Sequence, residues 1–197
     1  MAKYEGGDGY LDPETGVLRN RLGIADERRL EQAEASLVAW RSYELSQKPL
    51  AGDFDLAHLQ AIHRHLFGDV YDWAGEIRTI DLAKGNTYFA HHTYIVNAAR
   101  PIFEHLKKER YLQGLNRTAF SERAAYYLGE INALHPFREG NGRAQREFIN
   151  PLAWANGYTI DWSAIHPDAL RQASIASFHG GETTPLADPI KANLQDR

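Results

Sequence analysis

The chain has 197 residues, of which 43% are hydrophobic and 24% are charged, and these fractions are typical of one compact, soluble domain. A formal net charge of -4 provides no overall attraction for a polyanion, so direct binding of nucleic acid is not expected. The absence of cysteine excludes disulfides, thiolate metal ligands and a cysteine nucleophile. No window is apolar enough for a membrane span or a signal-peptide core, so no membrane partner is expected either.

The first 53 residues combine an irregular segment with one helix. Residues 1–23 are rich in Gly, Asp, Pro and Tyr, which favour turns. Asp26 is a candidate N-cap, and the string "ERRLEQAEASLVAWRSYEL" that follows it predicts a helix of about five turns. The apolar residues of this helix recur at three- to four-residue steps: Leu30, Ala33, Leu37, Val38 and Trp40.

Three more helices are predicted before residue 135. "FDLAHLQAIHRHLFG" ends at Gly68 and has an apolar face made of Phe54, Leu59, Ile62, Leu66 and Phe67. "TYIVNAARPIFEHLKKERYLQG" repeats the pattern with a proline inside it. "AFSERAAYYLGEINAL" is apolar around most of its circumference, which predicts a central buried helix with a stripe of Ala124, Leu128, Ile131 and Leu134.

The segment "EIRTIDLAKGNTYFAHH" has the alternation of a strand rather than the period of a helix. Arg78, Ile80 and Leu82 alternate with polar residues in its first arm. A turn and a second arm of strand-forming residues follow: Lys84, Gly85, Asn86, Thr87, Tyr88 and Phe89. An isolated hairpin is marginally stable in water, so we predict a mainly helical domain with one short β-hairpin lying against it.

The stretch "NALHPFREGNGRAQREF", residues 132–148, concentrates groups that packing alone does not require. Pro136 and the glycines predict a loop, and the next helix opens at Asn141 or Gly142. A glycine-rich helix start exposes backbone N–H groups and the positive end of the helix dipole, which suits a phosphate. Arg143 and Arg146 lie three residues apart on one face, where they oppose the dipole unless an anion lies between them.

Two further residues complete a pattern typical of phosphoryl or nucleotidyl transfer. Glu139 carries the wrong charge for a phosphate but is a usual ligand for a magnesium ion that bridges to phosphate oxygens. His135 can accept a proton at neutral pH. Each residue taken singly has an ordinary structural explanation, and the hypothesis rests on their contiguity.

The string "HPFREGNGRAQR" matches every fixed position of His-Pro-Phe-x-Asp/Glu-Gly-Asn-Gly-Arg-x-x-Arg, the signature of the Fic (Fido) family. The chain resembles that family over residues 54–194. The resemblance implies a single helical Fic domain spanning residues 1–197, with residues 1–53 as an N-terminal extension and first helix. It also implies transfer of AMP from ATP to a Ser, Thr or Tyr hydroxyl of a target protein.

The same resemblance implies a role for each motif residue. His135 would be the general base, Phe137 would pack the loop on the core, and Glu139 would hold Mg2+. The anion-binding nest would consist of Gly140, Asn141 and Gly142, with Arg143 and Arg146 on the β- and γ-phosphates. The hairpin resembles the family's flap, which would align the target by strand addition through Lys84, Gly85, Asn86, Thr87 and Phe89.

Many family members carry an inhibitory helix with the pattern Ser/Thr-x-x-x-Glu-Gly/Asn. The nearest string here, Thr118 to Glu122, is followed by Arg123 and leads directly into the motif, so it does not fit. The chain therefore resembles stand-alone bacterial toxins whose small antitoxin supplies that helix and contacts Arg146. By analogy, the target would be a type II topoisomerase ATPase subunit. The location would be the bacterial cytoplasm, with translocation if the chain is part of a longer effector.

Other functions stay open at this point. The same scaffold could transfer UMP, phosphocholine or phosphate, could remove AMP, or could be a non-catalytic binding module. A metal hydrolase built on His63 and His65 or on His91 and His92 is disfavoured. His63 and His65 cannot share a helix face, adjacent histidines in a strand point to opposite sides, and neither pair has an evident third ligand, so packing or surface roles are expected.

Overall fold

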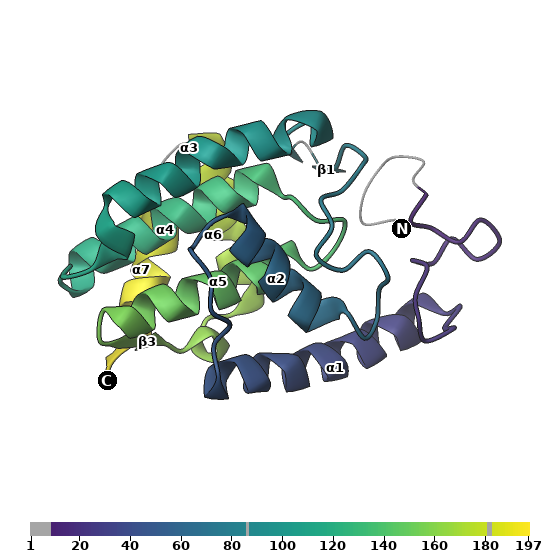
Figure 1. The fold of residues 1–197 in the computed structure, drawn as a ribbon, viewed down its shortest axis with the longest axis horizontal. Coiled ribbons are helices and arrows are strands. Elements are labelled where there is room, and N and C mark those ends of the chain that lie inside the picture. The colour runs from purple at the N-terminus through teal and green to yellow at the C-terminus, as the bar shows by residue number, and fades with distance from the viewer. Residues whose placement is uncertain (1–8, 86, 181–182) are drawn as a thin grey trace.

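A computed structural model describes residues 9–85, 87–180 and 183–197 (Figure 1). Its α-helices are α1 (Glu27–Gln47), α2 (Leu56–Phe67), α3 (Ile95–Lys108), α4 (Arg117–Leu134), α5 (Asn141–Ala155), α6 (Pro167–Gly180) and α7 (Thr184–Ala192). Its 3-10 turns are η1 (His92–Tyr94), η2 (Arg110–Leu112) and η3 (Trp162–Ala164). Two antiparallel sheets pair β1 (Ala83–Lys84) with β2 (Thr87–Tyr88) and β3 (Tyr158–Ile160) with β4 (Leu194–Asp196). The predicted helical fold with a short hairpin is confirmed, and the β3–β4 sheet is an addition that the sequence pattern did not predict.

The predicted N-cap of the first helix is confirmed by a capping hydrogen bond. The Asp26 carboxylate accepts from the backbone N–H of Arg29 at 2.8 Å and begins α1. Asp55 caps α2 in the same way, and α2 ends at Gly68 as predicted. A side-chain oxygen that satisfies one of the unpaired N–H groups at a helix start contributes about 1 kcal/mol.

The buried face of α1 differs from the predicted one. Trp40 was assigned to the apolar face but is 59% exposed. The positions buried in α1 are Leu30, Glu34, Val38 and Leu45, which recur at the spacing of one helix face. An acidic residue therefore occupies a core position of α1, and its partners lie in the candidate site.

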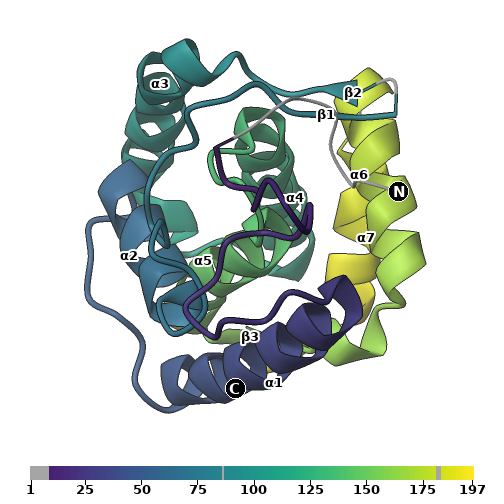
Figure 2. The same ribbon diagram turned by 90° about the vertical axis from the view of Figure 1, so that its right-hand side faces the viewer.

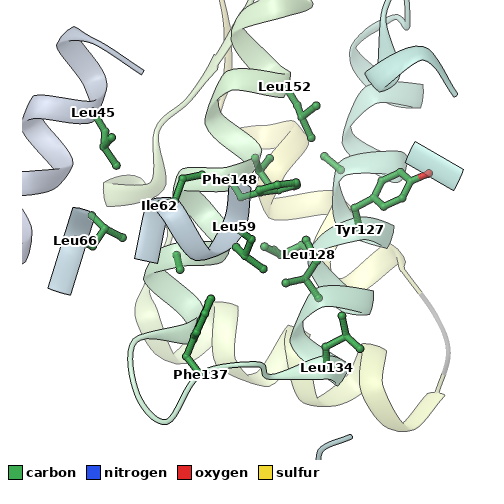
Figure 3. Packing of buried hydrophobic residues seen from close by; sticks show 14 of the residues in the cluster. Leu45, Leu59, Ile62, Leu66, Tyr127, Leu128, Leu134, Phe137, Phe148 and Leu152 are labelled. Carbon is green, nitrogen blue, oxygen red and sulfur yellow. The ribbon is translucent and has the colours of Figure 1, made fainter. Parts of the chain in front are cut away.

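Helix α4 lies at the centre of the domain, as predicted (Figure 2). It packs against α3, α5, α6 and α7, while α2 packs on α5. In the core, Leu59 and Ile62 from α2 point toward Phe148 of α5 and Leu128 of α4 (Figure 3). Burying each such side chain contributes about 1.5–3 kcal/mol, so this packing holds the end of α4 and the start of α5 in a fixed relation. No helix in the described ranges has the length and apolar character needed to cross a membrane.

The hairpin is shorter than predicted. Residues 78–82 were assigned to its first strand, but only Ala83–Lys84 and Thr87–Tyr88 pair as strands. The backbone N–H of Phe89 adds one further bond, to the carbonyl of Leu82 at 3.1 Å. The first arm leaves the strand conformation because its charged residue turns inward toward α4. Asn86 lies outside the described residues.

Candidate active site

His135 ends α4 in a left-handed backbone conformation, with φ 45° and ψ 61°. Its N–H still donates to the carbonyl of Ile131 at 3.0 Å, and Pro136 prevents the helix from continuing. A residue with a β-carbon costs about 1–2 kcal/mol in this region. Such strain persists only where surrounding contacts impose it, and it is frequent at functional sites.

The start of α5 requires both its glycine and its asparagine. Gly140 has a φ of 79°, and a β-carbon there would lie 2.3 Å from the Phe67 ring. The Asn141 side chain accepts from the N–H of Phe137 at 2.9 Å and donates to its carbonyl at 2.7 Å. Asn141 was predicted to belong to an anion nest. Because its side chain closes the loop, its contribution to a nest is limited to its backbone N–H, beside that of Gly142.

His63, a buried histidine of α2, holds the loop between α4 and α5 in place. The Nδ1 atom of His63 accepts from the N–H of Gly75, and Nε2 donates to the carbonyl of Glu139, both at 2.9 Å. Its ring stacks on Phe137 at 3.9 Å. Burial lowers the pKa of His63 to about 3, so the ring stays neutral. The predicted packing role is confirmed for His63, while His65 faces α1 instead.

Arg78 ties the base of the hairpin to the loop. Its side chain is buried and donates to the main-chain carbonyls of His135, Ile80, Ala90 and Leu134. Its backbone N–H donates to the carbonyl of Pro136 at 2.9 Å. Burial lowers the pKa of Arg78. Alternation had predicted a strand position for this residue, whereas its structural role is to fix the backbone around His135.

The His135 ring lies between the loop and the hairpin. It stacks on Phe89 with ring centroids 3.7 Å apart. Its Nδ1 atom lies 3.3 Å from the carbonyl oxygen of Asn132, which can only accept, so Nδ1 carries the proton. The lone pair is therefore on Nε2, the tautomer that a general base requires.

The two motif arginines have different surroundings. Arg143 lies 2.7 Å from Glu34 of α1, 3.6 Å from Glu139, and above the Phe67 ring. Tyr71, whose pKa is raised by burial, keeps its hydroxyl proton and donates it to Glu34. Among the described residues, no carboxylate lies within ion-pair distance of Arg146. Burial, together with the nearby charge of Arg143, lowers the pKa of Arg146. A bound anion would relieve this repulsion.

One cleft of about 770 Å³ brings most of the predicted residues together, a volume within the usual range for small-ligand sites. Its lining includes His135, Glu139, Gly140, Asn141, Gly142, Arg143 and Arg146, together with Lys84 from the hairpin. The Glu139 carboxylate accepts from the N–H of Gly140 at 3.0 Å. Of the other predicted flap residues, Gly85 is exposed, Thr87 is buried, and Phe89 covers the His135 ring.

Several cleft residues escaped the sequence analysis. Glu34 could have been noticed as an acid within the helical stripe of Leu30 and Val38. The cleft lining also includes apolar residues from η3, the residues after it and α6, among them Trp162, Ile165 and Leu170. No local signal marks these residues, because η3 and α6 reach the cleft only through the fold.

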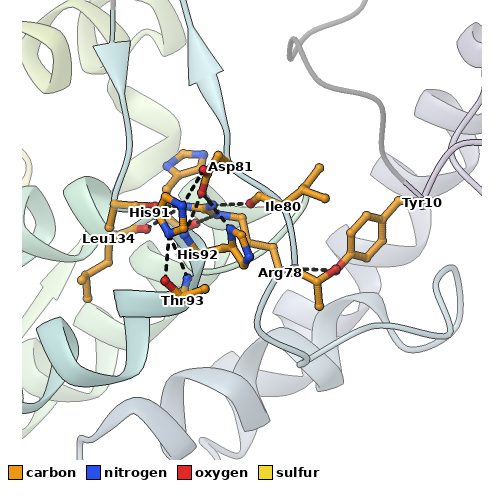
Figure 4. A network of polar contacts seen from close by, with 11 residues as sticks. Tyr10, Arg78, Ile80, Asp81, His91, His92, Thr93 and Leu134 are labelled. Carbon is orange, nitrogen blue, oxygen red and sulfur yellow. Dashed lines mark hydrogen bonds and ion pairs between the residues drawn. The ribbon is translucent and has the colours of Figure 1, made fainter.

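The base of the hairpin contradicts one expectation. His91 and His92 were expected to point to opposite sides, but both contact the Asp81 carboxylate, at 3.1 and 2.9 Å (Figure 4). The change of side arises because His92 begins the η1 turn, where strand alternation no longer applies. The backbone N–H and the ring of His92 donate to Asp81 and hold the pKa of its carboxyl below the usual range.

The fold and the cleft define a class of protein: a helical domain whose cleft, suited to an anionic ligand, lies where a left-handed turn meets a glycine-opened helix. The model of the Fic/DOC family matches residues 53–153. The chain belongs to the Fic/DOC family.

Named relatives cover the chain almost completely. It is 52% identical over 197 residues to "Protein adenylyltransferase VbhT" of Bartonella schoenbuchensis, and spans 41% of that longer protein. It is 42% identical to "Probable protein adenylyltransferase Fic" of Escherichia coli, with 91% of this chain and 88% of that protein covered.

Solved structures show the same fold. BepC of Bartonella tribocorum, a VirB-translocated effector protein with bound AMPPNP, has a TM-score of 0.90 and 28% identity, covering 95% of this chain and 97% of that one. The Fic domain of a Bartonella quintana Bep effector protein with bound ADP has a TM-score of 0.91 and 29% identity, covering 95% of each chain.

Proposed function

We propose that this chain is a protein adenylyltransferase, which transfers AMP from ATP to a Ser, Thr or Tyr hydroxyl of a target protein. Relatives at 52% and 42% identity carry that name, and two structural neighbours hold AMPPNP and ADP. Because the chain spans less than half of VbhT, the activity proposed concerns the domain present here.

The observation that carries the proposal is the composition of one cleft. His135, the glycine-opened start of α5, Arg143 and Arg146 line the same space, although they come from a turn and a helix face. The two arginines are suited to binding a triphosphate. The apolar part of the lining, which includes Trp162 of η3, is suited to a purine ring.

The residues supply the parts of an in-line transfer. The target hydroxyl oxygen forms a bond to the α-phosphorus of ATP, while the bond from that phosphorus to the α,β-bridging oxygen breaks. Nε2 of His135 accepts the hydroxyl proton, a contribution of typically about 100- to 10,000-fold. Pyrophosphate leaves from the positions held by Arg143, Arg146 and the N–H groups of α5.

A magnesium ion suits the donor set at the edge of this cleft. Glu139 places a carboxylate beside the proposed phosphate seat, and its side chain is only 13% exposed. Magnesium in nucleotide sites is usually held by one or two carboxylates and by the phosphates themselves. When bound, it would neutralise phosphate charge and help to orient the triphosphate.

The hairpin would present the target. Lys84 lies at the edge of the cleft, and the strands beside it could pair with an extended segment of the target protein. Gly85, Thr87 and Phe89 would set the path of this segment past His135, and the same role is proposed for Asn86.

The proposed partners follow from the family resemblance. A small antitoxin carrying Ser/Thr-x-x-x-Glu-Gly/Asn would place its glutamate on Arg146, the motif arginine with no carboxylate within ion-pair distance among the described residues. A type II topoisomerase ATPase subunit is the proposed target by analogy. The proposed location is the bacterial cytoplasm, or a translocated effector if the domain belongs to a longer chain.

The proposal is tested by intact-protein mass spectrometry of lysate proteins incubated with the chain, ATP and magnesium. AMP adducts should form with the wild type and with His105→Gln, an exposed-histidine control on α3. They should be absent with His135→Asn, and excess unlabelled UTP or CDP-choline should not reduce them. If wild type and His135→Asn both yield no adduct, or if another nucleotide supplies the group, the proposal is wrong.

A further inference from the structure

A second cluster of chemically active side chains lies at the base of the hairpin. Asp81 precedes β1, and His91 and His92 follow β2 (Figure 4). Each offers one ligand atom, and these atoms lie within 4.8 Å of one another. None of the three lines the candidate active-site cleft.

The separations are already close to those of a metal centre. Asp81 Oδ2 lies 3.1 Å from His91 Nε2, and Asp81 Oδ1 lies 2.9 Å from His92 Nδ1. With zinc–ligand bonds of about 2.0–2.2 Å, tetrahedral coordination separates two ligand atoms by roughly 3.3 Å. The two rings are stacked at 4.7 Å, so they must turn for both lone pairs to converge. Their side chains, 50% and 30% exposed, have room to do so.

We propose that Asp81, His91 and His92 bind a divalent transition-metal ion of the zinc class. Two imidazole nitrogens and one carboxylate oxygen are ligands that Zn2+, Co2+, Ni2+ and Cu2+ share, whereas Mg2+ prefers oxygen alone. Three protein ligands leave at least one position of the ion for water. This site goes beyond the proposed AMP transfer and does not depend on it.

Neighbouring groups orient the ligands. The Thr93 hydroxyl lies 2.9 Å from His91 Nδ1, and the Thr93 backbone N–H donates to the same nitrogen at 3.4 Å, so Thr93 fixes the ring orientation in which Nε2 faces Asp81. The N–H of His92 donates to Asp81 Oδ1 at 2.8 Å and fixes the carboxylate. The opposing charge is Arg78, with Nη1 3.9 Å from Asp81 Oδ1. Its guanidinium is committed to backbone carbonyls, so it weakens the site without filling it.

A bound ion would join the two arms of the hairpin. Asp81 and His91 lie on either side of the β1–β2 pair, whose strands have two residues each. A cross-link between them removes conformational freedom from the chain that it encloses. Hydrogen exchange of backbone amides in β1 and β2 should therefore slow when the ion is present.

The site is tested on metal-free protein titrated with Zn2+ by calorimetry and with Co2+ by visible absorption. The wild type should bind one equivalent with a tetrahedral cobalt spectrum, and so should the controls His105→Gln and Glu139→Gln. Binding should weaken at least about tenfold in Asp81→Asn, His91→Gln and His92→Gln, because each loses a ligand. Thr93→Val removes the hydroxyl contact to His91 and should weaken zinc affinity about 10- to 100-fold.

Hydrogen exchange gives an independent readout. Zinc should slow exchange in residues 83–85 and 87–88 of the wild type and leave it unchanged in His91→Gln. Equal zinc affinity in the wild type and in the three ligand variants would overturn the proposal. So would an absence of zinc binding by the folded wild type, or loss of that binding in Glu139→Gln alone, which would place the ion in the cleft.

Discussion

The two walls of the cleft differ in how firmly the molecule holds them. The loop from His135 to Asn141 is largely buried, and its backbone is held by His63 at the carbonyl of Glu139 and by Arg78 at the carbonyl of His135. The hairpin has two-residue strands, and Lys84 at its turn is exposed. A site for an unvarying ligand such as a triphosphate benefits from rigid positioning, whereas a surface that receives a protein segment benefits from adaptability. This difference in rigidity fits the proposal that the loop carries the chemistry and that the hairpin aligns the target.

The largest effect is expected at the proposed general base. His135→Asn keeps a residue that tolerates the left-handed backbone, so the loop should retain its shape while proton transfer is lost. The rate of AMP transfer should fall about 100- to 10,000-fold, with little change in thermal unfolding. Initial rates of AMP transfer from labelled ATP measure this fall. A fall of less than tenfold would remove His135 from the mechanism.

Two neighbouring glycines test the rigidity of the loop. Gly140→Ala places a β-carbon against Phe67 at 2.3 Å and at a φ of 79°, so it should lose about 2–5 kcal/mol of unfolding free energy. The matched change Gly142→Ala meets only the Arg146 side chain at 3.6 Å and should lose less than about 1 kcal/mol. Urea denaturation compares them, and equal losses would mean that the loop is not tightly packed.

The neutral His63 beneath the loop predicts a dependence on pH. Its pKa in the folded protein, about 3, is lower than in the unfolded chain. The contribution of neutral His63 to the free energy of unfolding is therefore fully present above about pH 6.5. It is lost as pH falls toward 3, because only the unfolded chain gains the proton. Between pH 6.5 and 5 the loss should approach about 2 kcal/mol. In His63→Gln, the decrease in the free energy of unfolding between pH 6.5 and 5 that His63 causes should vanish. If the free energy of unfolding of this variant falls with pH as steeply as that of the wild type, His63 is not the residue responsible.

The ion pair between Glu34 and Arg143 should weaken ATP binding by a smaller free energy than the changes above. Glu34→Gln can still accept from Tyr71 but removes the negative charge that holds Arg143. ATP should then bind a few-fold more tightly, about 1 kcal/mol, because the phosphates no longer compete with a carboxylate. Calorimetry measures the affinity. Weaker binding in the variant would show instead that Glu34 positions the arginine for its ligand.

The smallest effect is expected in the hairpin. Lys84→Ala changes an exposed side chain and should alter stability by less than about 0.5 kcal/mol. ATP affinity should stay the same, while modification of a protein target should slow a few-fold. Rates with the target protein, compared with ATP binding, separate the two effects. A loss of ATP affinity as large as that in Arg146→Ala would place Lys84 in the phosphate site.

The sequence by itself determined the parts of the protein that depend on neighbouring residues. Helical periodicity and capping residues such as Asp26 predicted α1 to α5 but not α6 and α7, and the Pro136 and Gly140 positions predicted the loop between α4 and α5. The motif residues were found because they are contiguous, and the cleft contains them.

Only the tertiary structure decided the contacts that join distant segments. Glu34 beside Arg143, and Arg78 beneath His135, arise from pairings across 109 and 57 residues of sequence. The turn of His91 and His92 toward one carboxylate and the β3–β4 sheet likewise depend on where the chain is placed by its core. Local patterns carry the preferences of a residue and its near neighbours, whereas these contacts exist only after apolar burial has packed the helices together.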